Sequence, residues 1–396
     1  MEDLTTWRLQ PDPETFPFDA VVATFKRVGK HFVPRDLLAE LDAVRAGLPA
    51  PAGADDEVLA GFLATALDKW DERYDNPSYL AVDLLGLPEG DDVPGAARRR
   101  DRLFAMLVAD LLRFELAAAD GTTDLLPQLR PDARLTAKRC RLAVRAALPA
   151  LARLGIAVDA TEAGGLDAAR EVRDAILADL GAGERRLLSI TDLTVSEVHD
   201  EHMFMRVLQA YETTFALIAV ALRTAIAALA DGRSRDAASA LAAAEQAMRE
   251  AKPLFSLVAT MQPEAFLTFR EFTDGASAIQ SRSYKTVESL CRTPERARID
   301  SPAYRSVPEV RERVLAGQPT FDDALSVAQA AGTLAQDELD AVRAAMARFE
   351  EAVLAWRQTH YRMAVRMLGE RRGTGHTEGV PYLGAVRSIP LFAQAA

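Results

Sequence analysis

The feature that most constrains the fold is the dominance of helix-forming residues along the whole 396-residue chain. Ala, Leu, Arg and Glu recur throughout, whereas the alternating Val, Ile, Thr and aromatic runs typical of half-buried strands are almost absent. Stretches rich in Pro and Gly, such as residues 48–53 and 87–95, separate amphipathic segments. The sequence therefore predicts an all-α protein.

The apolar periodicity predicts a first group of helices over residues 36–46, 56–74, 95–119 and 133–154. A second group is predicted over residues 197–230 (with Ser196 as N-cap), 235–261, 263–272, 281–290 and 337–369. Four prolines between residues 291 and 320 predict mostly loop. Turn signals at residues 156–165 and 181–183 predict a domain boundary there, with an N-terminal helical domain over residues 1–180 and a second helical domain over residues 181–396.

Charge and cysteine content exclude several classes of protein. The 58 acidic side chains outnumber the 47 basic ones and leave a net charge of -11. Because the electrostatic field of such a chain repels the phosphates of nucleic acid, we do not expect a nucleic-acid-binding protein. We expect no membrane span, since no uninterrupted apolar run approaches the roughly 20 residues required. The first residues lack the pattern of a signal peptide, and two cysteines are too few for a disulfide framework, so we expect a cytoplasmic protein.

His360 is the most distinctive of the five histidines. On a helix it shares one face with Trp356, Met363 and Met367, which places it on the apolar stripe. A buried imidazole must hydrogen-bond through its nitrogens or bind something else. Periodicity alone leaves both interpretations open: a hydrogen-bonded core histidine or a ligand.

His199 and His202 lie three residues apart at a predicted helix start. They could share a metal ion, but zinc usually takes three protein ligands and the His-Glu-x-x-His spacing is absent. No histidine follows a glutamate by three residues, so a di-iron site is unsupported. The alternative is that Asp200 and Glu201 interact with the helix N-terminus while both histidines are partly exposed.

Arg270 stands in an aromatic setting, after Phe266 and Phe269 and before Phe272. A guanidinium fork there suits bidentate capture of a carboxylate, and an ordinary ion pair to one of the acidic residues is the alternative. Near the C-terminus, Thr374 lies between glycines in a loop whose backbone can approach a ligand closely. The loop lacks the Gly-Lys-Ser/Thr of a phosphate loop.

Four collinear blocks resemble the tryptophan 2,3-dioxygenase superfamily of haem enzymes. The first two are His199-Asp-Glu-His-Met-Phe204 with Gln209, Tyr211 and Glu212, and Thr260-Met-x-Pro with Phe269-Arg270, Ala276-Ser277 and Gln280-Ser281. The last two are Trp356-Arg357 with His360, Met363 and Gly369, and Arg372-Gly-Thr-Gly375 with Gly379 and Tyr382-Leu383. Together they extend across residues 187–392.

The resemblance implies an all-α helical bundle that encloses haem b, with an additional N-terminal helical domain. It implies that His360 is the axial ligand of the haem iron and that Ser281 belongs to the cofactor-binding block. It further implies that His199 is the distal catalytic residue. Arg270 would anchor the substrate carboxylate; the other substrate-binding residues would be Phe266, Thr374 and Val195.

By the same resemblance, the protein is a dioxygenase that cleaves the indole 2,3 bond of L-tryptophan or a derivative with O2. His202 and His376 depart from the family pattern, and residues 1–180 match nothing in the tetrameric dioxygenases. Two alternatives therefore stay open. One is a haem-dependent monooxygenase or ring-rearranging enzyme of the tyrosine hydroxylase or pyrrolnitrin type, and the other is a non-catalytic haem sensor. The sequence also leaves a homo-oligomer open.

Overall fold

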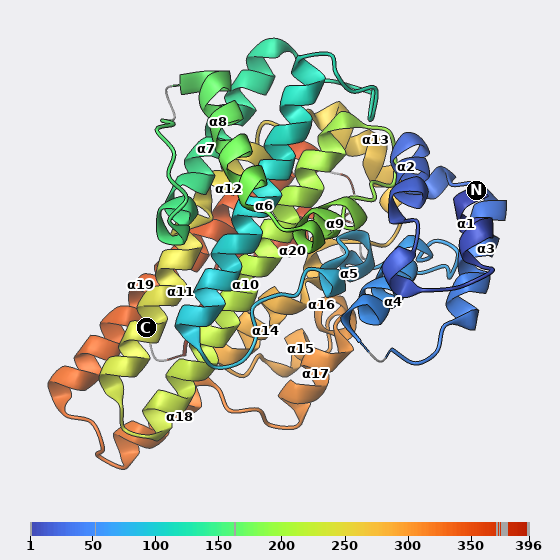
Figure 1. Cartoon of the computed structure of the whole chain (residues 1–396). Coiled ribbons are helices and arrows are strands. Elements are labelled where there is room, and N and C mark those ends of the chain that lie inside the picture. The colour runs from blue at the N-terminus through green and yellow to red at the C-terminus, as the bar shows by residue number, and fades with distance from the viewer. Residues whose placement is uncertain are drawn as a thin grey trace.

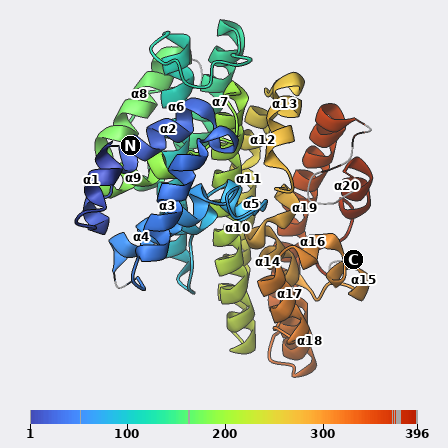
Figure 2. The same ribbon diagram turned by 90° about the vertical axis from the view of Figure 1, so that its right-hand side faces the viewer.

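The computed structural model describes residues 2–51, 53–161, 164–369, 371, 373 and 379–393. Within these ranges the chain is helical and contains no strand; a single isolated bridge joins Gln128 to Val198. The predicted all-α class is confirmed. The long helices run through the middle of the molecule, and shorter ones cover them (Figures 1 and 2).

Four short N-terminal helices form a small core of their own, and a fifth, α5 (Asn76–Tyr79), packs in a separate cluster through Tyr79. The four are α1 (Glu2–Trp7), α2 (Phe18–Val28), α3 (Arg35–Gly47) and α4 (Ala54–Ala66). Their apolar faces bury Phe25, Leu41 and Phe62 together with Ile190 and Leu193 from a later part of the chain. Helix α4 ends eight residues before the predicted position, where the chain turns away.

The main core is a bundle built from helices before and after residue 180. Its members are α6 (Val93–Ala119), α7 (Ala133–Leu154), α8 (Gly165–Asp179), α9 (Ala182–Ile190), α10 (His199–Ala230), α11 (Ser234–Glu250), α12 (Lys252–Val258) and α13 (Pro263–Thr273). Ala169, Val172 and Ile176 of α8 join the same hydrophobic core as α10. One core thus extends across residue 180, and the division there into two domains stays a prediction.

Helix α10 is the centre of this bundle. Every residue from Gln209 to Leu222 is buried, because α6, α11, α14 and α18 surround the helix. By length and composition α10 is apolar enough to cross a membrane, but 72% of its most apolar window is buried inside the molecule. A helix that is apolar on all sides is typical of a protein core.

The C-terminal helices complete the fold. They are α14 (Arg282–Cys291), α15 (Arg296–Ile299), α16 (Pro302–Arg305), α17 (Pro308–Leu315), α18 (Phe321–Ala330), α19 (Gln336–Leu368) and α20 (Val380–Val386). The predicted loop over residues 291–320 is wrong, because Pro302 and Pro308 stand in the first turn of α16 and α17. Proline is tolerated there, since the first-turn N–H groups have no partner within the helix.

Two other helix predictions differ from the structure. The single helix predicted over residues 235–261 is divided into α11 and α12, and Pro253 stands at the start of α12, where its ring cannot continue the preceding helix. Ser196 does not cap α10. Its hydroxyl donates instead to Glu201 Oε2 (2.6 Å), and α10 begins at His199.

Candidate active site

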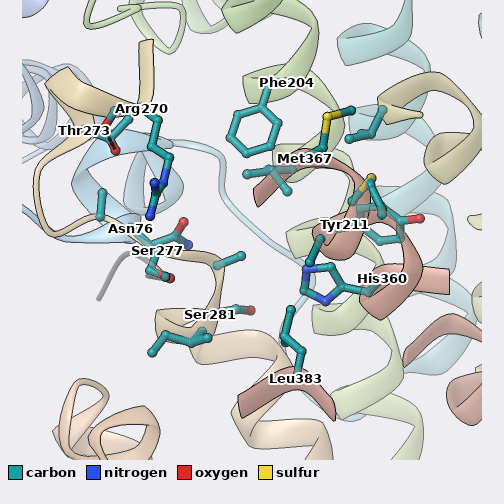
Figure 3. A pocket seen from close by; sticks show the side chains of 18 of the residues that line it. Asn76, Phe204, Tyr211, Arg270, Thr273, Ser277, Ser281, His360, Met367 and Leu383 are labelled. Atoms are coloured by element: carbon teal, nitrogen blue, oxygen red, sulfur yellow. Dashed lines mark hydrogen bonds between the residues drawn. The ribbon is translucent and has the colours of Figure 1, made fainter. Parts of the chain in front are cut away.

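A large cavity lies among α10, α12, α13, α14, α19 and α20, with α5 on one side (Figure 3). It holds about 1360 Å³ of space free of atoms, its open mouth included. An open cavity with a mostly apolar lining and a few polar groups is the usual setting of a small-molecule or cofactor site.

Aromatic side chains from helices far apart in the sequence dominate the lining. They include Phe204, Tyr211, Phe215, Phe255, Phe266 and Trp356. Their rings pack against one another, for example Phe215 against Trp356 with centroids 5.3 Å apart. Because edge-to-face contacts fix ring positions, the walls form a shaped apolar surface suited to flat ligands.

The imidazole of His360 faces this cavity from α19 (Figure 3). Its neighbours are the rings of Phe255 and Trp356, with centroids 6.0 and 5.5 Å away. Among the described residues, none forms a hydrogen bond with its ring nitrogens. Burial lowers the pKa of His360 from 6.5 to about 4, so the ring is neutral at pH 7 and keeps a lone pair available.

Arg357 fixes α19 one turn before His360. It donates to Tyr284 Oη (2.6 Å), to the Ile389 carbonyl (2.5 Å) and to Glu288 Oε1 (3.2 Å). Burial alone would raise the pKa of Glu288, but Lys285, Arg298 and Arg357 hold it well below its usual range. This charged cluster joins α19 to α14 and so sets the position of His360.

A smaller cavity adjoins His360 and has a basic lining. Lys285, Arg298, Arg357 and Arg387 all line it. Since Glu288 compensates only part of this positive charge, the cavity favours carboxylate or phosphate groups of a ligand.

Arg270 lines a different side of the large cavity, beside Asn76, Thr273 and Ser277 (Figure 3). Partial burial lowers its pKa, as does the charge of Arg371, yet an arginine stays charged at any physiological pH. A cation at the edge of an apolar cavity suits a ligand with a carboxylate on an aromatic body.

Glu212 is a buried carboxyl group in the lining next to Ser281. Burial raises its pKa, and the neighbouring hydroxyls of Ser281 and Ser283 partly offset this rise. Its Oε2 atom has no hydrogen-bond partner among the described residues. Ser281 also caps α14, where its hydroxyl accepts a hydrogen bond from the Tyr284 N–H (3.1 Å).

Residues 183–315 match the sequence model of the family described as tryptophan 2,3-dioxygenase. Similar proteins named tryptophan 2,3-dioxygenase come from Bordetella pertussis (26% identity over 233 residues, 50% of this chain and 82% of the relative) and Anaeromyxobacter sp. strain K (28% over 226 residues, 50% and 85%). One from Polaromonas naphthalenivorans is 26% identical over 235 residues, with 50% and 83% covered. These matches support membership of the tryptophan 2,3-dioxygenase superfamily, at moderate identity over half of the chain.

The superfamily match covers α10, α13 and α14, and therefore Arg270, Phe266 and Ser281. His360 lies on α19, beyond the matched range. Of the residues that the superfamily resemblance implied, these four all line the one large cavity. The structure thus brings together side chains that are up to 94 residues apart, from Phe266 to His360.

His199 does not join them. It does not line the cavity and is fully buried between α10 and α6, where its ring centroid lies 4.8 Å from that of Phe114 and its Nε2 lies 3.4 Å from Glu115 Oε2. The superfamily pattern implies a distal role for this side chain, and the lining of the described cavity does not include it. The alternative expectation, that both histidines are partly exposed, is wrong, because His199 and His202 are 0% and 1% exposed.

The other two predicted substrate residues also lie outside the described lining. Val195 is buried in a small cluster with Tyr79 and Met205, behind the cavity wall. Thr374 falls outside the described residues, as does His376; the flanking Gly373 and Gly379 line the cavity.

A second cluster with metal-ligand chemistry surrounds His202. One ligand atom each from Asp110, Asp192 and His202 lies within 4.8 Å of the others. Arg206 donates to Asp110 Oδ2 (2.8 and 2.5 Å), and Lys26 pairs with Asp192 (2.8 Å). Since both carboxylates are already matched by basic side chains, the cluster fits a structural ion-pair network better than a metal site.

Sequence reasoning missed the contribution of α5 to the cavity. Asn76, Tyr79 and Leu80 line it, although they lie outside the superfamily match. No motif marks them, because they reach the cavity only through tertiary packing. Glu212 belongs to the first of the four sequence blocks, but nothing in its sequence context predicts that it lines the cavity.

Proposed function

We propose that this protein is a haem-dependent oxygenase that acts on an aromatic amino acid, with O2-dependent cleavage of the indole 2,3 bond of L-tryptophan or a derivative as its reaction. The observation that carries the proposal is that one apolar cavity is lined by the neutral imidazole of His360 and, at another side, by the guanidinium of Arg270. The superfamily match and the names of the relatives support the same reaction class.

The residues present fit a haem group. His360 offers a neutral nitrogen lone pair toward a largely apolar cavity with aromatic walls, and the adjoining basic lining suits the two carboxylates of protoporphyrin IX. Neither cysteine, Cys140 nor Cys291, lines the described cavity, which favours non-covalent haem b over a thioether-linked haem. Haem, when bound, supplies the redox chemistry that activates dioxygen.

The protein's own residues bind and orient the substrate. Phe204, Phe266 and Phe269 form an apolar surface for the indole ring and exclude water from it. Arg270 binds the carboxylate, which leaves the ring one orientation in the cavity. Holding reactants in a fixed geometry can lower a barrier by about 7–11 kcal/mol, so this anchoring is a large part of what the protein contributes.

A second candidate is insertion of a single oxygen atom, or ring rearrangement. One observation favours keeping it: among the described lining residues, His360 is the sole histidine. No second imidazole is therefore in place there to hydrogen-bond an indole N–H. A phenol or an altered indole would meet the same apolar walls and the same carboxylate anchor.

The test is aerobic incubation of the reduced, haem-loaded protein with L-tryptophan under labelled dioxygen, followed by mass spectrometry. We expect a product that has gained two labelled oxygen atoms. One labelled oxygen, or an isomerised skeleton, would support the second candidate instead. A haem-loaded protein that neither converts an aromatic amino acid nor changes its absorption spectrum on addition would contradict both and favour a sensor.

A further inference from the structure

Helix α5 contributes a polar side chain to the Arg270 side of the cavity. Asn76, at the start of this helix, lines the cavity, and its carboxamide lies beside Arg270 and Ser277 (Figure 3). Asn76 is the only asparagine among the 396 residues. It lies outside residues 183–315, the range that matches the superfamily model.

Contacts of the backbone hold Asn76 in place. Its N–H donates to Gln280 Oε1 (2.9 Å), which also accepts from the Ser277 N–H (3.0 Å). Gly275 passes so close that a Cβ atom there would lie 3.0 Å from the Tyr74 carbonyl oxygen. The start of α5 is therefore packed directly against the segment that follows Arg270.

Further buried contacts fix the rest of α5 against α10 and against the 3-10 turn at residues 30–32. Gln209 donates to the Leu80 carbonyl (2.8 Å), and Tyr79 Oη donates to Glu201 (3.3 Å). Lys30 Nζ pairs with Asp68 (2.8 Å) and lies 3.4 Å from the Ser78 carbonyl. The side chain of Asn76 is thus carried by a rigid element, which is what a specificity-determining residue requires.

The side chain of Asn76 is part of the cavity wall. Asn76 is only 2% exposed, and its hydrogen bond to Gln280 uses the backbone N–H and not the carboxamide. An amide in the wall of a largely apolar cavity is a natural hydrogen-bond partner for a polar group of a ligand. It lies where the polar end of an amino acid anchored by Arg270 would lie.

We propose that Asn76 determines specificity for α-amino acids, with its carboxamide oxygen accepting a hydrogen bond from the substrate's α-ammonium group while Arg270 binds the carboxylate. The inference rests on the proposed function. The α-ammonium group of a bound amino acid needs a hydrogen-bond acceptor, and the charge of Arg371 acts on this side of the cavity and disfavours an ammonium group without one. The hydroxyl proton of Thr273, the neighbouring side chain, is already donated to the Arg270 carbonyl (2.8 Å).

The test compares two ligands that differ in the ammonium group alone: L-tryptophan and 3-(indol-3-yl)propionate. Each is titrated into haem-loaded full-length protein, and the dissociation constant is read from the change in haem absorption. We expect Asn76→Ala to weaken tryptophan binding about 10- to 100-fold, the effect of one hydrogen bond to a charged group. Binding of the propionate is expected to change less than about 3-fold on the same scale.

Three further variants sharpen the comparison. Asn76→Asp keeps an acceptor oxygen and is expected to retain the preference for tryptophan. Arg270→Ala is expected to weaken both ligands, because both have the carboxylate. Gln10→Ala, which removes an exposed carboxamide that does not line the cavity, controls for substitution as such. Thermal unfolding and haem content show whether Asn76→Ala is folded.

The outcomes separate the two proposals. An unchanged ratio of the two dissociation constants in Asn76→Ala, whether both ligands weaken equally or neither does, overturns the role of Asn76 and leaves the proposed function standing. If the unaltered protein binds neither ligand, the proposed function fails and this inference fails with it.

Discussion

Three histidines of this protein occupy two contrasting environments. His360 lies against aromatic rings and faces the large cavity, with the basic lining of the smaller cavity beside it. His199 and His202 lie against Phe114 in a closed core, close to the carboxylates of Glu115 and Asp110. The comparison teaches that an imidazole becomes a candidate ligand when it lines an open cavity, as the partly exposed His360 does, and not when the core encloses it.

The largest effect is expected at His360. His360→Ala removes the one imidazole in the described cavity lining, so the purified protein should contain little haem even when haem is supplied during expression. The haem absorption per protein measures this. If the variant contains as much haem as the unaltered protein, His360 is not the ligand of the haem iron. The two histidine environments would then show no functional difference.

The closed region should respond through stability. Asp110→Ala leaves the buried Arg206 without its ion-pair partner, although Arg206 keeps its hydrogen bond to the Leu188 carbonyl (2.6 Å). Loss of one partner of a buried pair costs about 3–5 kcal/mol, which urea unfolding measures. The folded fraction should still bind haem. Loss of haem binding at unchanged stability would mean that this region serves the site directly.

At the other side of the cavity, Arg270→Ala should keep the haem and lose about two orders of magnitude in turnover of an amino-acid substrate, since the anchor of the carboxylate is gone. Steady-state kinetics on the haem-loaded variant measure this effect. Arg270→Lys keeps the charge without the fork and is the matched control. Turnover that is unaffected by the alanine substitution would contradict the anchoring role.

The pKa of His360 predicts a pH dependence that the charged region does not share. Because its pKa falls from 6.5 in the unfolded chain to about 4 in the folded one, the unfolded state binds the proton first as the pH decreases. The haem-free protein should therefore lose about 2 kcal/mol of unfolding free energy between about pH 7 and pH 5 on account of this group. His360→Ala serves as the reference, and an identical pH profile of both proteins would contradict the shift.

The smallest effect is expected from His199→Leu. Its side chain lies outside the described cavity lining, and Glu115 retains Arg139 as a partner (3.0 Å). Turnover of the haem-loaded variant should stay within about 3-fold, because no group that contacts the substrate is lost. A decrease of two orders of magnitude with haem retained would restore His199 as the distal residue and reverse the comparison between the two regions.

Much of the fold followed from local sequence signals. Helix α7 (Ala133–Leu154) has the predicted bounds, and α6, α13 and α19 differ from prediction by one or two residues at an end. The failures have local causes as well: Pro253 divides a helix, and Pro302 and Pro308 begin helices where a loop was predicted. A proline ends a helix when helical residues precede it and is tolerated in the first turn of a new helix. Hydrophobic periodicity does not distinguish these two cases.

The candidate site was only partly predictable. His360, Arg270 and Phe266 stand in motifs, and helical periodicity placed His360 on an apolar stripe. His199 also stands in a motif, but from the start of α10 its side chain contacts Phe114 and Glu115 of α6 and not the cavity. Which side of α10 meets α6 depends on how the two helices pack, and a motif does not show this. Asn76 reaches the cavity from a segment 194 residues before Arg270, a contact that no local pattern shows.

The most direct test of the central claim is chemical rescue of His360→Gly with imidazole. We predict that this variant loses the haem absorption band of the unaltered protein and that added imidazole, which fits the space left by the side chain, restores both haem binding and the same spectrum. A glycine variant whose haem spectrum already equals that of the unaltered protein, with no response to imidazole, would contradict iron coordination by His360.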